Sequence, residues 1–359
     1  MILYGMISLV MIFIILLAYR RSALSGNVDT LPSKDQATER TVFWGCLLFF
    51  WVLTAFRDIT IGNDTITYCR YFTSICNYGI NESYFIEVGF QKILAFIGKF
   101  TNDPHVFLII FSSILYFPIG IIIYKKSSDL LIATFFTYFF CFGCFCSMLR
   151  QGLAMVICFY AYIQLKDNKR YRFIALVLLA SCIHTSAFCV LLLILHKYIP
   201  KSNKFILGVV VTTLALSSTS FFLSVSNFFG GAYSGYFESK YAGSGYLGTV
   251  LSLIRGVLIL LVIKDDKENK KDAYYSLSYT NAMFIVFFLC CGFTVNLIGR
   301  ISDYFVLFSI LDLTYTFSNK KEKRSLFVFL FSYIILLNNL VLIFRPEWNH
   351  LYPYEFWHK

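Results

Sequence analysis

Long apolar runs recur along the whole chain and alternate with short polar segments. A membrane helix needs roughly 17–25 residues, and the runs near this length predict about twelve membrane helices. They lie near residues 2–19, 41–56, 105–123, 130–147, 149–165, 172–184, 185–199, 205–224, 246–263, 276–296, 301–317 and 325–344. We therefore expect an all-α polytopic membrane protein with a single transmembrane domain over residues 1–359.

Composition supports this class, since 58% of the residues are hydrophobic and only 14% are charged. In soluble domains about a quarter are charged. The first apolar run has no basic n-region and no cleavage-site pattern, and it is followed by Arg20 and Arg21. We expect this run to be retained as an anchor and not removed as a signal peptide.

Lys and Arg residues indicate the orientation because they resist translocation across the membrane. Most of the 31 basic residues fall in alternate loops, which we assign to the cytoplasm. The run at 173–195 is ambiguous, because a single span there would invert every later helix. A hairpin that turns near His184 keeps more of the later basic residues inside, so the charge pattern favours the hairpin and places both termini outside.

The first arm of this hairpin, residues 172–184, would rise only roughly 20 Å at about 1.5 Å per residue. This is less than the roughly 30 Å of the hydrocarbon core. We therefore expect His184 to lie below the outer surface, at the floor of a cavity.

Two outer segments lie between the predicted spans. Residues 57–104 form the larger one, and within it residues 84–100 carry apolar side chains at three- and four-residue spacing. This spacing predicts an amphipathic helix in the outer interface. The second segment, the loop 225–246, is rich in Gly, Ser and Tyr; a mobile lid and an ordinary flexible connector fit it equally well.

Arginine is frequent at the outer ends of the spans and within them. The residues concerned are Arg57, Arg70, Arg150, Arg255, Arg300 and Arg345. Snorkelling or a carboxylate partner explains any one of them alone, and Arg345 fits that explanation. The group as a whole, beside few outer carboxylates, indicates an anionic ligand, because a guanidinium holds phosphate or carboxylate oxygens with a fixed fork of donors.

Asp64, Glu87 and His184 form a matching set of acid–base candidates. Each also has a structural explanation. Asp64 lies in a tight turn that suits an Asx turn, Glu87 lies on the polar face of its helix, and His184 suits a hydrogen bond within the hairpin turn. The sequence alone leaves these alternatives open.

Other chemistries lack their motifs. The chain has no D-x-D sequence, no spaced His and Cys ligand set and no glycine-rich phosphate loop, so we expect neither a metal nor a cofactor. The net charge of +11 follows from membrane orientation and gives no reason to expect nucleic acid. Cys69 and Cys76 share the outer segment, and the sequence does not decide whether they form a disulfide.

Five short segments occur in order along the chain: "FRDITIGNDTITYCRYF" (56–72), "EVGF" (87–90), "LRQGLA" (149–154), "LLASCIHTSA" (178–187) and "GRISDYF" (299–305). In combination, over about residues 40–320, they resemble the EpsG-like branch of the Wzy polysaccharide polymerases. The resemblance implies a GT-C-like, metal-independent glycosyltransferase of the bacterial inner membrane. Such enzymes transfer a growing O-antigen, capsule or exopolysaccharide chain from undecaprenyl diphosphate to the next lipid-linked unit at the periplasmic face.

In such an enzyme, outer arginines would stabilise the charge that builds on the leaving diphosphate. The candidates are, in order of preference, Arg57, Arg150, Arg300, Arg255 and Arg70. His184 is the first candidate for the base that accepts the proton of the attacking hydroxyl, and Asp64 is the first for binding sugar hydroxyls. Glu87 is the remaining acid–base candidate.

Tyr68, Gln151 and Tyr304 are candidate sugar-binding residues, although tyrosines are also common at membrane interfaces. The implied partners are an undecaprenyl-diphosphate-linked oligosaccharide, the lipid bilayer and, as a further candidate, a chain-length regulator. Both termini and the active site would face the periplasm.

Two other functions remain open. A flippase or transporter of lipid-linked oligosaccharides would also need outer arginines, but it would carry polar residues along both halves of a central path. Here the polar residues within spans cluster toward the outer side.

An O-antigen ligase shares the chemistry, but ligases characteristically have a long periplasmic loop late in the chain, whereas the largest outer segment here comes early.

Overall fold

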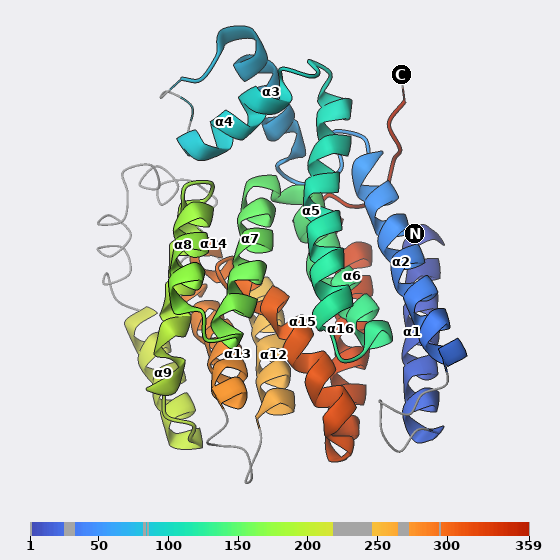
Figure 1. The fold of residues 1–359 in the computed structure, drawn as a ribbon, viewed down its shortest axis with the longest axis vertical. Coiled ribbons are helices and arrows are strands. Elements are labelled where there is room, and N and C mark those ends of the chain that lie inside the picture. The colour runs from blue at the N-terminus through green and yellow to red at the C-terminus, as the bar shows by residue number, and fades with distance from the viewer. Residues whose placement is uncertain are drawn as a thin grey trace.

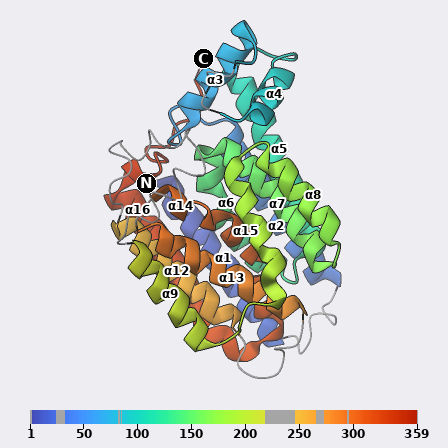
Figure 2. The ribbon, with the colours of Figure 1, turned by 90° about the vertical axis from the view of Figure 1, so that its left-hand side faces the viewer.

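The computed structural model describes residues 2–24, 33–81, 84, 86–217, 246–264, 273–293 and 296–358. Most of these residues lie in helices, and the only β-structure among them is an isolated bridge between Arg57 and Phe356. Long helices form one bundle, and two short helices, α3 and α4, cover one end of it (Figures 1 and 2). The all-α class is confirmed.

The helices of the first half are α1 (Ile2–Leu24), α2 (Ser33–Ala55), α3 (Thr65–Tyr78), α4 (Val88–Ile97), α5 (Pro104–Lys126), α6 (Leu130–Ser147), α7 (Leu149–Lys166) and α8 (Arg170–Ser181). The second half holds η2 (Thr185–Lys197), α9 (Asn203–Ser217), α12 (Tyr246–Ile263), α13 (Ala273–Cys291), α14 (Asn296–Gly299), α15 (Ser302–Asn319), η4 (Lys321–Lys323), α16 (Arg324–Phe344) and η5 (Pro346–Trp348).

Six helical segments in the described part of the chain are long and apolar enough to cross a membrane. They are Ile2–Ser22, Pro104–Lys126, Leu130–Ser147, Tyr246–Ile263, Tyr274–Cys291 and Lys321–Phe344. The other predicted spans are helices that are shorter or more polar, so about twelve spans stays a prediction. Residues 218–224 of the predicted span at 205–224 and residues 225–245 of the predicted loop lie outside the described residues.

The predicted hairpin at His184 is present. Helix α8 ends at Ser181, and after a short turn η2 begins at Thr185 as a 3-10 helix. The two arms pack against each other. At the far end of η2, the carbonyl of His196 accepts a hydrogen bond from Ser276 near the start of α13 (2.6 Å). The second arm therefore runs back along the bundle.

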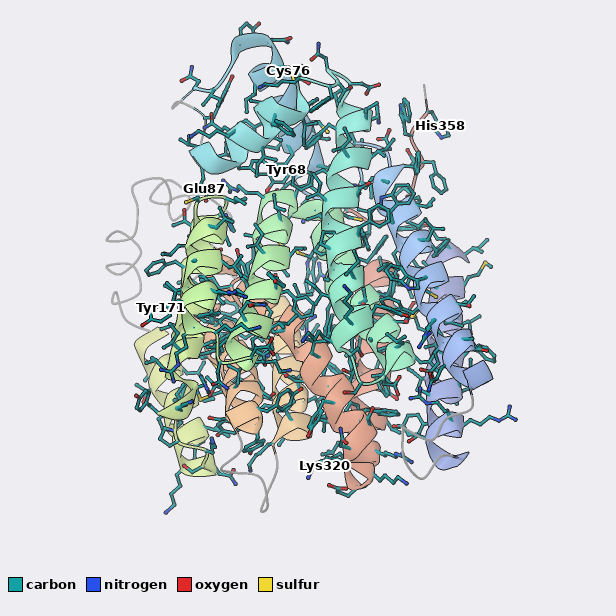
Figure 3. All side chains as sticks on the ribbon, in the orientation of Figure 1. Tyr68, Cys76, Glu87, Tyr171, Lys320 and His358 are labelled. Carbon is teal, nitrogen blue, oxygen red and sulfur yellow. The ribbon has the colours of Figure 1, made fainter. Side chains whose placement is uncertain are left out.

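The basic segment that contains Lys320 lies at the end of the bundle opposite α3 and α4 (Figure 3). Hydrogen bonds link this segment to two other parts of the chain: Lys323 donates to the carbonyl of Lys264, and Arg324 donates to Ser22. Basic residues that are far apart in the sequence therefore meet at this end. Which compartment each end faces stays a prediction.

The segment 57–104 contains two helices where the sequence predicted one over residues 84–100. Helix α3 was not predicted, and α4 is only ten residues long. The apolar face of α4 packs inside the protein. The centre of the Phe90 ring lies 5.7 Å from that of Tyr68 in α3 and 5.8 Å from that of Phe111 in α5. The sequence suggested this face for the membrane interface, and that interpretation is wrong. An interfacial position of the helix as a whole stays a prediction.

Residues 345–358, the C-terminal strap, run back along the α3–α4 end of the bundle (Figure 1). Backbone hydrogen bonds tie the strap to the start of the outer segment: Asp58 N to Glu355 O (3.0 Å), Gly62 N to His350 O (2.9 Å) and Trp357 N to Phe56 O (3.0 Å). The Tyr4 hydroxyl donates to the Leu351 carbonyl (2.6 Å), so the two ends of the chain meet at the same end of the bundle. The side of the membrane on which the termini lie stays a prediction.

Gly62 is required where the strap crosses the outer segment. Its φ is +91°, and a Cβ atom at this position would lie 2.4 Å from the carbonyl oxygen of Cys146. Gly79 also has a positive φ (+78°), but nothing lies within 4 Å of its Cβ position. Substituting Gly62 therefore tests the combined cost of an unfavourable φ and a steric clash, whereas substituting Gly79 tests the cost of the φ value alone.

We expect Gly62→Ala to lower the unfolding free energy by at least about 3 kcal/mol, because the substitution adds a backbone clash to an unfavourable φ. Gly79→Ala should cost only about 1 kcal/mol, the cost of the φ value alone. Melting temperatures of the purified variants in detergent test this. Equal losses for the two variants would contradict it.

Candidate functional site

The carboxylate of Glu87 joins three separate parts of the chain at the α3–α4 end of the bundle (Figure 3). Its Oε2 accepts a hydrogen bond from Arg150 NH1 at 2.6 Å. Its Oε1 lies 3.2 Å from His184 Nδ1 and accepts hydrogen bonds from the backbone N–H of Thr185 (2.9 Å) and from the Thr185 hydroxyl (3.1 Å). Two of the three acid–base candidates and one predicted arginine thus form a single cluster.

Local structure explains why these groups meet. Glu87 is the N-cap residue of α4 but makes no side-chain capping bond, so its carboxylate points away from its own helix. Gly89 lets α4 lie directly on the hairpin turn, since a Cβ there would be 2.2 Å from the carbonyl oxygen of Cys182. Arg150 is in the first turn of α7. The solvated role considered for Glu87 and the purely local role considered for His184 are both wrong.

The neighbours of Glu87 keep it ionised. Burial alone raises the pKa of a carboxyl group, but the hydrogen bond from His184, the charge of Arg150 and the Thr185 N–H outweigh burial and lower the pKa of Glu87 to about 2. A carboxylate with so low a pKa is a poor proton acceptor near neutral pH. Glu87 is therefore suited to orient His184 and unsuited to act as the base.

The ionised carboxylate also fixes the tautomer of His184. Glu87 can only accept hydrogen bonds, so the Nδ1 of a neutral His184 must carry the proton that lies between them. Nε2 then has a free lone pair. This is the pairing of base and orienting carboxylate that nucleophilic catalysis commonly uses.

The lowered pKa of Glu87 has a consequence for stability. A carboxylate whose pKa falls on folding stabilises the folded state above its ordinary pKa, here 4.5, and this contribution is lost as the pH falls toward about 2. A shift of this size corresponds to about 3 kcal/mol. We expect the melting temperature of the wild-type protein to exceed that of Glu87→Gln at about pH 5–8. The difference between the two melting temperatures should shrink as the pH falls below this range.

Thermal unfolding of both proteins across the pH range measures this difference. Glu347→Gln is the matched control, because Glu347 is exposed and its ion pair within the described part of the chain is with the exposed Arg345 (3.6 Å). A gap between wild type and Glu87→Gln that does not change with pH would contradict the assignment.

Asp64 and Arg300 form a second pair beside this cluster. Arg300 NH1 lies 4.0 Å from Asp64 Oδ2, and both side chains are partly exposed. Asp64 is the N-cap residue of α3, yet its side chain makes no capping bond, which weakens the Asx-turn explanation. Gln151 Nε2 donates to the carbonyl of Arg300 (2.8 Å), so the residue next to Arg150 holds the backbone of Arg300.

Three predicted sugar-binding residues are buried. Tyr304 is fully buried and its hydroxyl lies 3.2 Å from Ser186 Oγ, Tyr68 is 7% exposed, and Gln151 is 5% exposed. Tyr68 and Tyr304 make contacts inside the protein, and Gln151 holds the backbone of Arg300. We do not carry them forward as sugar ligands.

Arg57 is also accounted for by the fold. Its side chain is completely buried and donates to the backbone carbonyls of Thr54, Ile61 and Cys146. These contacts tie the outer segment to α6. The geometry assigns Arg57 a structural role, so we leave it out of the proposed diphosphate site. Arg70 is on an exposed face of α3.

A model of the EpsG family matches residues 41–356. The chain belongs to the EpsG family. The matched region includes Glu87, Arg150, His184 and Arg300, and it extends through most of the C-terminal strap. No curated protein and no solved structure gives a significant match.

Within this EpsG-family chain, sequence reasoning missed two polar residues beside the candidate site: Thr185, which donates to Glu87, and Asp303, whose backbone N–H donates to the carbonyl of Arg300 (3.1 Å). Both lie inside segments that carried the resemblance, "LLASCIHTSA" and "GRISDYF". Asp303 had a detectable signal, because an ionisable residue within an apolar helix is by itself a functional candidate. Thr185 had none, since its contact with Glu87 spans 98 positions of sequence.

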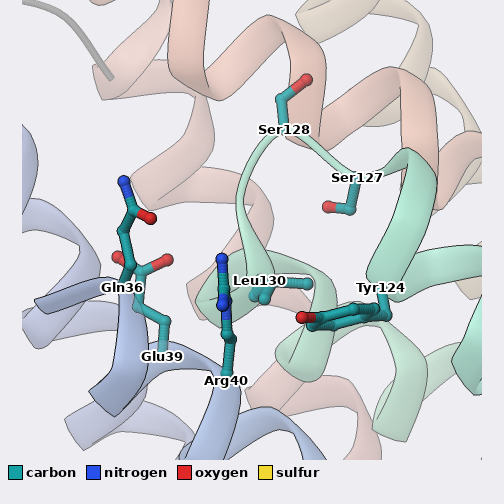
Figure 4. Close-up of a pocket in the computed structure, with 7 residues that line it drawn as sticks. All are labelled: Gln36, Glu39, Arg40, Tyr124, Ser127, Ser128 and Leu130. Atoms are coloured by element: carbon teal, nitrogen blue, oxygen red, sulfur yellow. The ribbon is translucent and has the colours of Figure 1, made fainter. Parts of the chain in front are cut away.

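A pocket of about 330 Å³ lies at the opposite end of the bundle (Figure 4). Its lining residues are Gln36, Glu39, Arg40, Tyr124, Ser127, Ser128 and Leu130. None of them is a predicted site residue. Among the described residues, no three His, Cys, Asp or Glu side chains gather as metal ligands. Cys69 and Cys76 are free thiols in this structure.

Proposed function

We propose that this protein is a polysaccharide polymerase at the periplasmic face of the bacterial inner membrane. It would transfer a growing glycan from undecaprenyl diphosphate to the next lipid-linked unit. The observation that carries the proposal is the Glu87–His184–Arg150 cluster in a chain of the EpsG family. The cluster provides a base, the carboxylate that orients it and a guanidinium beside them.

In the proposed reaction, a hydroxyl oxygen of the incoming unit attacks the anomeric carbon of the growing chain. His184 Nε2 accepts the hydroxyl proton as the new C–O bond forms. The bond from the anomeric carbon to the diphosphate oxygen breaks, and its electron pair leaves with the diphosphate. The products are the lengthened lipid-linked chain, free undecaprenyl diphosphate and one proton.

Arg150 and Arg300 are the proposed ligands of the leaving diphosphate. Arg150 uses NH1 for Glu87, and the side chain of Arg300 is 45% exposed. Two guanidinium groups beside the leaving diphosphate would stabilise the negative charge that develops in the transition state. We propose Asp64, beside Arg300, as a ligand of sugar hydroxyls, and we expect catalysis without a metal.

Glycan ladders test this function in cells. The gene is deleted from a strain that contains its native glycan cluster, and surface glycan is separated on a gel. We expect the deletion to leave a single repeat unit and the gene to restore long chains. Complete loss of surface glycan in the deletion strain, including the single repeat, would contradict a polymerase and indicate export or ligation.

A further inference from the structure

Arg255 occupies an unusual position in the middle of α12. Its guanidinium carbon lies 5.8 Å from the centre of the Phe140 ring in α6, a cation–π distance. The Nε atom is buried, and no residue in the described ranges accepts a hydrogen bond from it. A buried guanidinium N–H that lacks a protein acceptor in an apolar helix is costly, and such residues commonly serve a ligand.

Asp303 supplies compensating negative charge. It lies in the first turn of α15, a helix that packs against α12. It interacts electrostatically with both Arg255 and Arg300, yet it forms no ion pair with either among the described contacts. Its backbone N–H donates to the carbonyl of Arg300 (3.1 Å), which places Asp303 directly beside the proposed reaction site.

The charges of this group restrict the ligand that fits it. A phosphate between Arg255 and Asp303 would be repelled by the carboxylate, and a cation would be repelled by Arg255 and Arg300. A hydroxyl group satisfies both sides, because it accepts a hydrogen bond from a guanidinium and donates one to a carboxylate. Adjacent hydroxyl groups on one ring are characteristic of sugars.

We propose that Arg255 and Asp303 form a sugar subsite that holds one residue of the glycan next to the diphosphate site. This inference rests on the proposed function and changes the role of Arg255, which the sequence suggested as a diphosphate ligand. Asp303 gains a role that no motif had given it. The connection through Arg300 links the subsite to the groups that hold the diphosphate.

Binding of two lipids to the purified protein in nanodiscs tests the subsite. One probe is the lipid-linked repeat unit extracted from the host strain, and the other is undecaprenyl diphosphate without sugar. Arg255→Gln and Asp303→Asn should each weaken binding of the first lipid about tenfold or more, as expected for loss of a hydrogen bond to a charged group. Affinity for the second lipid should weaken far less than affinity for the first in both variants.

Equal weakening for both lipids would overturn the subsite and assign Arg255 to the diphosphate. No weakening for either lipid would overturn it in favour of a structural role. Arg345→Gln, at an exposed ion pair, is the matched control. If a neutral variant does not fold, Arg255→Lys and Asp303→Glu keep the charge and change the geometry, and the same selective loss is expected. A wild-type protein that binds neither lipid would contradict the proposed function itself.

Discussion

Replacing His184 with alanine should reduce the rate of chain growth by at least about 100-fold, the usual contribution of a general base. The Glu87 carboxylate and the Thr185 contacts would remain, but no Nε2 would be present to accept the hydroxyl proton. The measurement is the rate at which purified protein lengthens lipid-linked repeat units in nanodiscs. Affinity for the repeat unit should change little, because His184 acts on the transition state.

The control for this variant is His358→Ala. His358 is exposed at the end of the C-terminal strap, where Figure 3 labels it away from Glu87. Its replacement should leave the rate unchanged. A His184→Ala protein that folds normally and retains more than about a tenth of the wild-type rate would exclude His184 as the base.

Replacing Arg150 with alanine is expected to lower the rate by about 100- to 1,000-fold, the range for loss of one group that stabilises developing negative charge. Arg150→Lys keeps the charge but loses the planar fork, so it should recover only part of the activity. Inhibition by undecaprenyl diphosphate should weaken in parallel, because the released lipid would use the same contacts.

Arg150 also touches Glu87 at 2.6 Å, so its effect through Glu87 must be separated from its effect on substrate. The double variant Arg150→Ala/Glu87→Gln provides this separation. A double variant no slower than Glu87→Gln alone would show that Arg150 acts only by holding Glu87. Arg345→Ala, at an exposed pair of the same type, should have no effect.

Much of the architecture was predictable because lipid imposes simple rules on sequence. Apolar length predicted most of the long helices, and the distribution of Lys and Arg predicted the hairpin at His184. His184, Glu87 and Arg150 were identifiable as candidates because ionisable residues beside membrane helices are costly. Their mutual contact was not predictable, since it depends on how closely Gly89 lets α4 approach the hairpin turn.

The errors have a common physical origin. The apolar face of α4 was placed on the membrane because periodicity shows that a face is buried but not what covers it. Arg57 looked like a ligand for phosphate because sequence does not reveal that backbone carbonyls occupy its donors. The C-terminal strap carries no strong pattern, because backbone hydrogen bonds such as Trp357 to Phe56 make little demand on side chains.

The most direct test of the account is reconstitution. Purified protein is mixed with its lipid-linked repeat unit in nanodiscs, and both glycan length and free undecaprenyl diphosphate are followed over time. We predict chains of increasing length, with one undecaprenyl diphosphate released for each new glycosidic bond, and chain growth that is at least about 100-fold slower for His184→Ala. Release of the lipid without chain growth, or no reaction from folded wild-type protein, would contradict it.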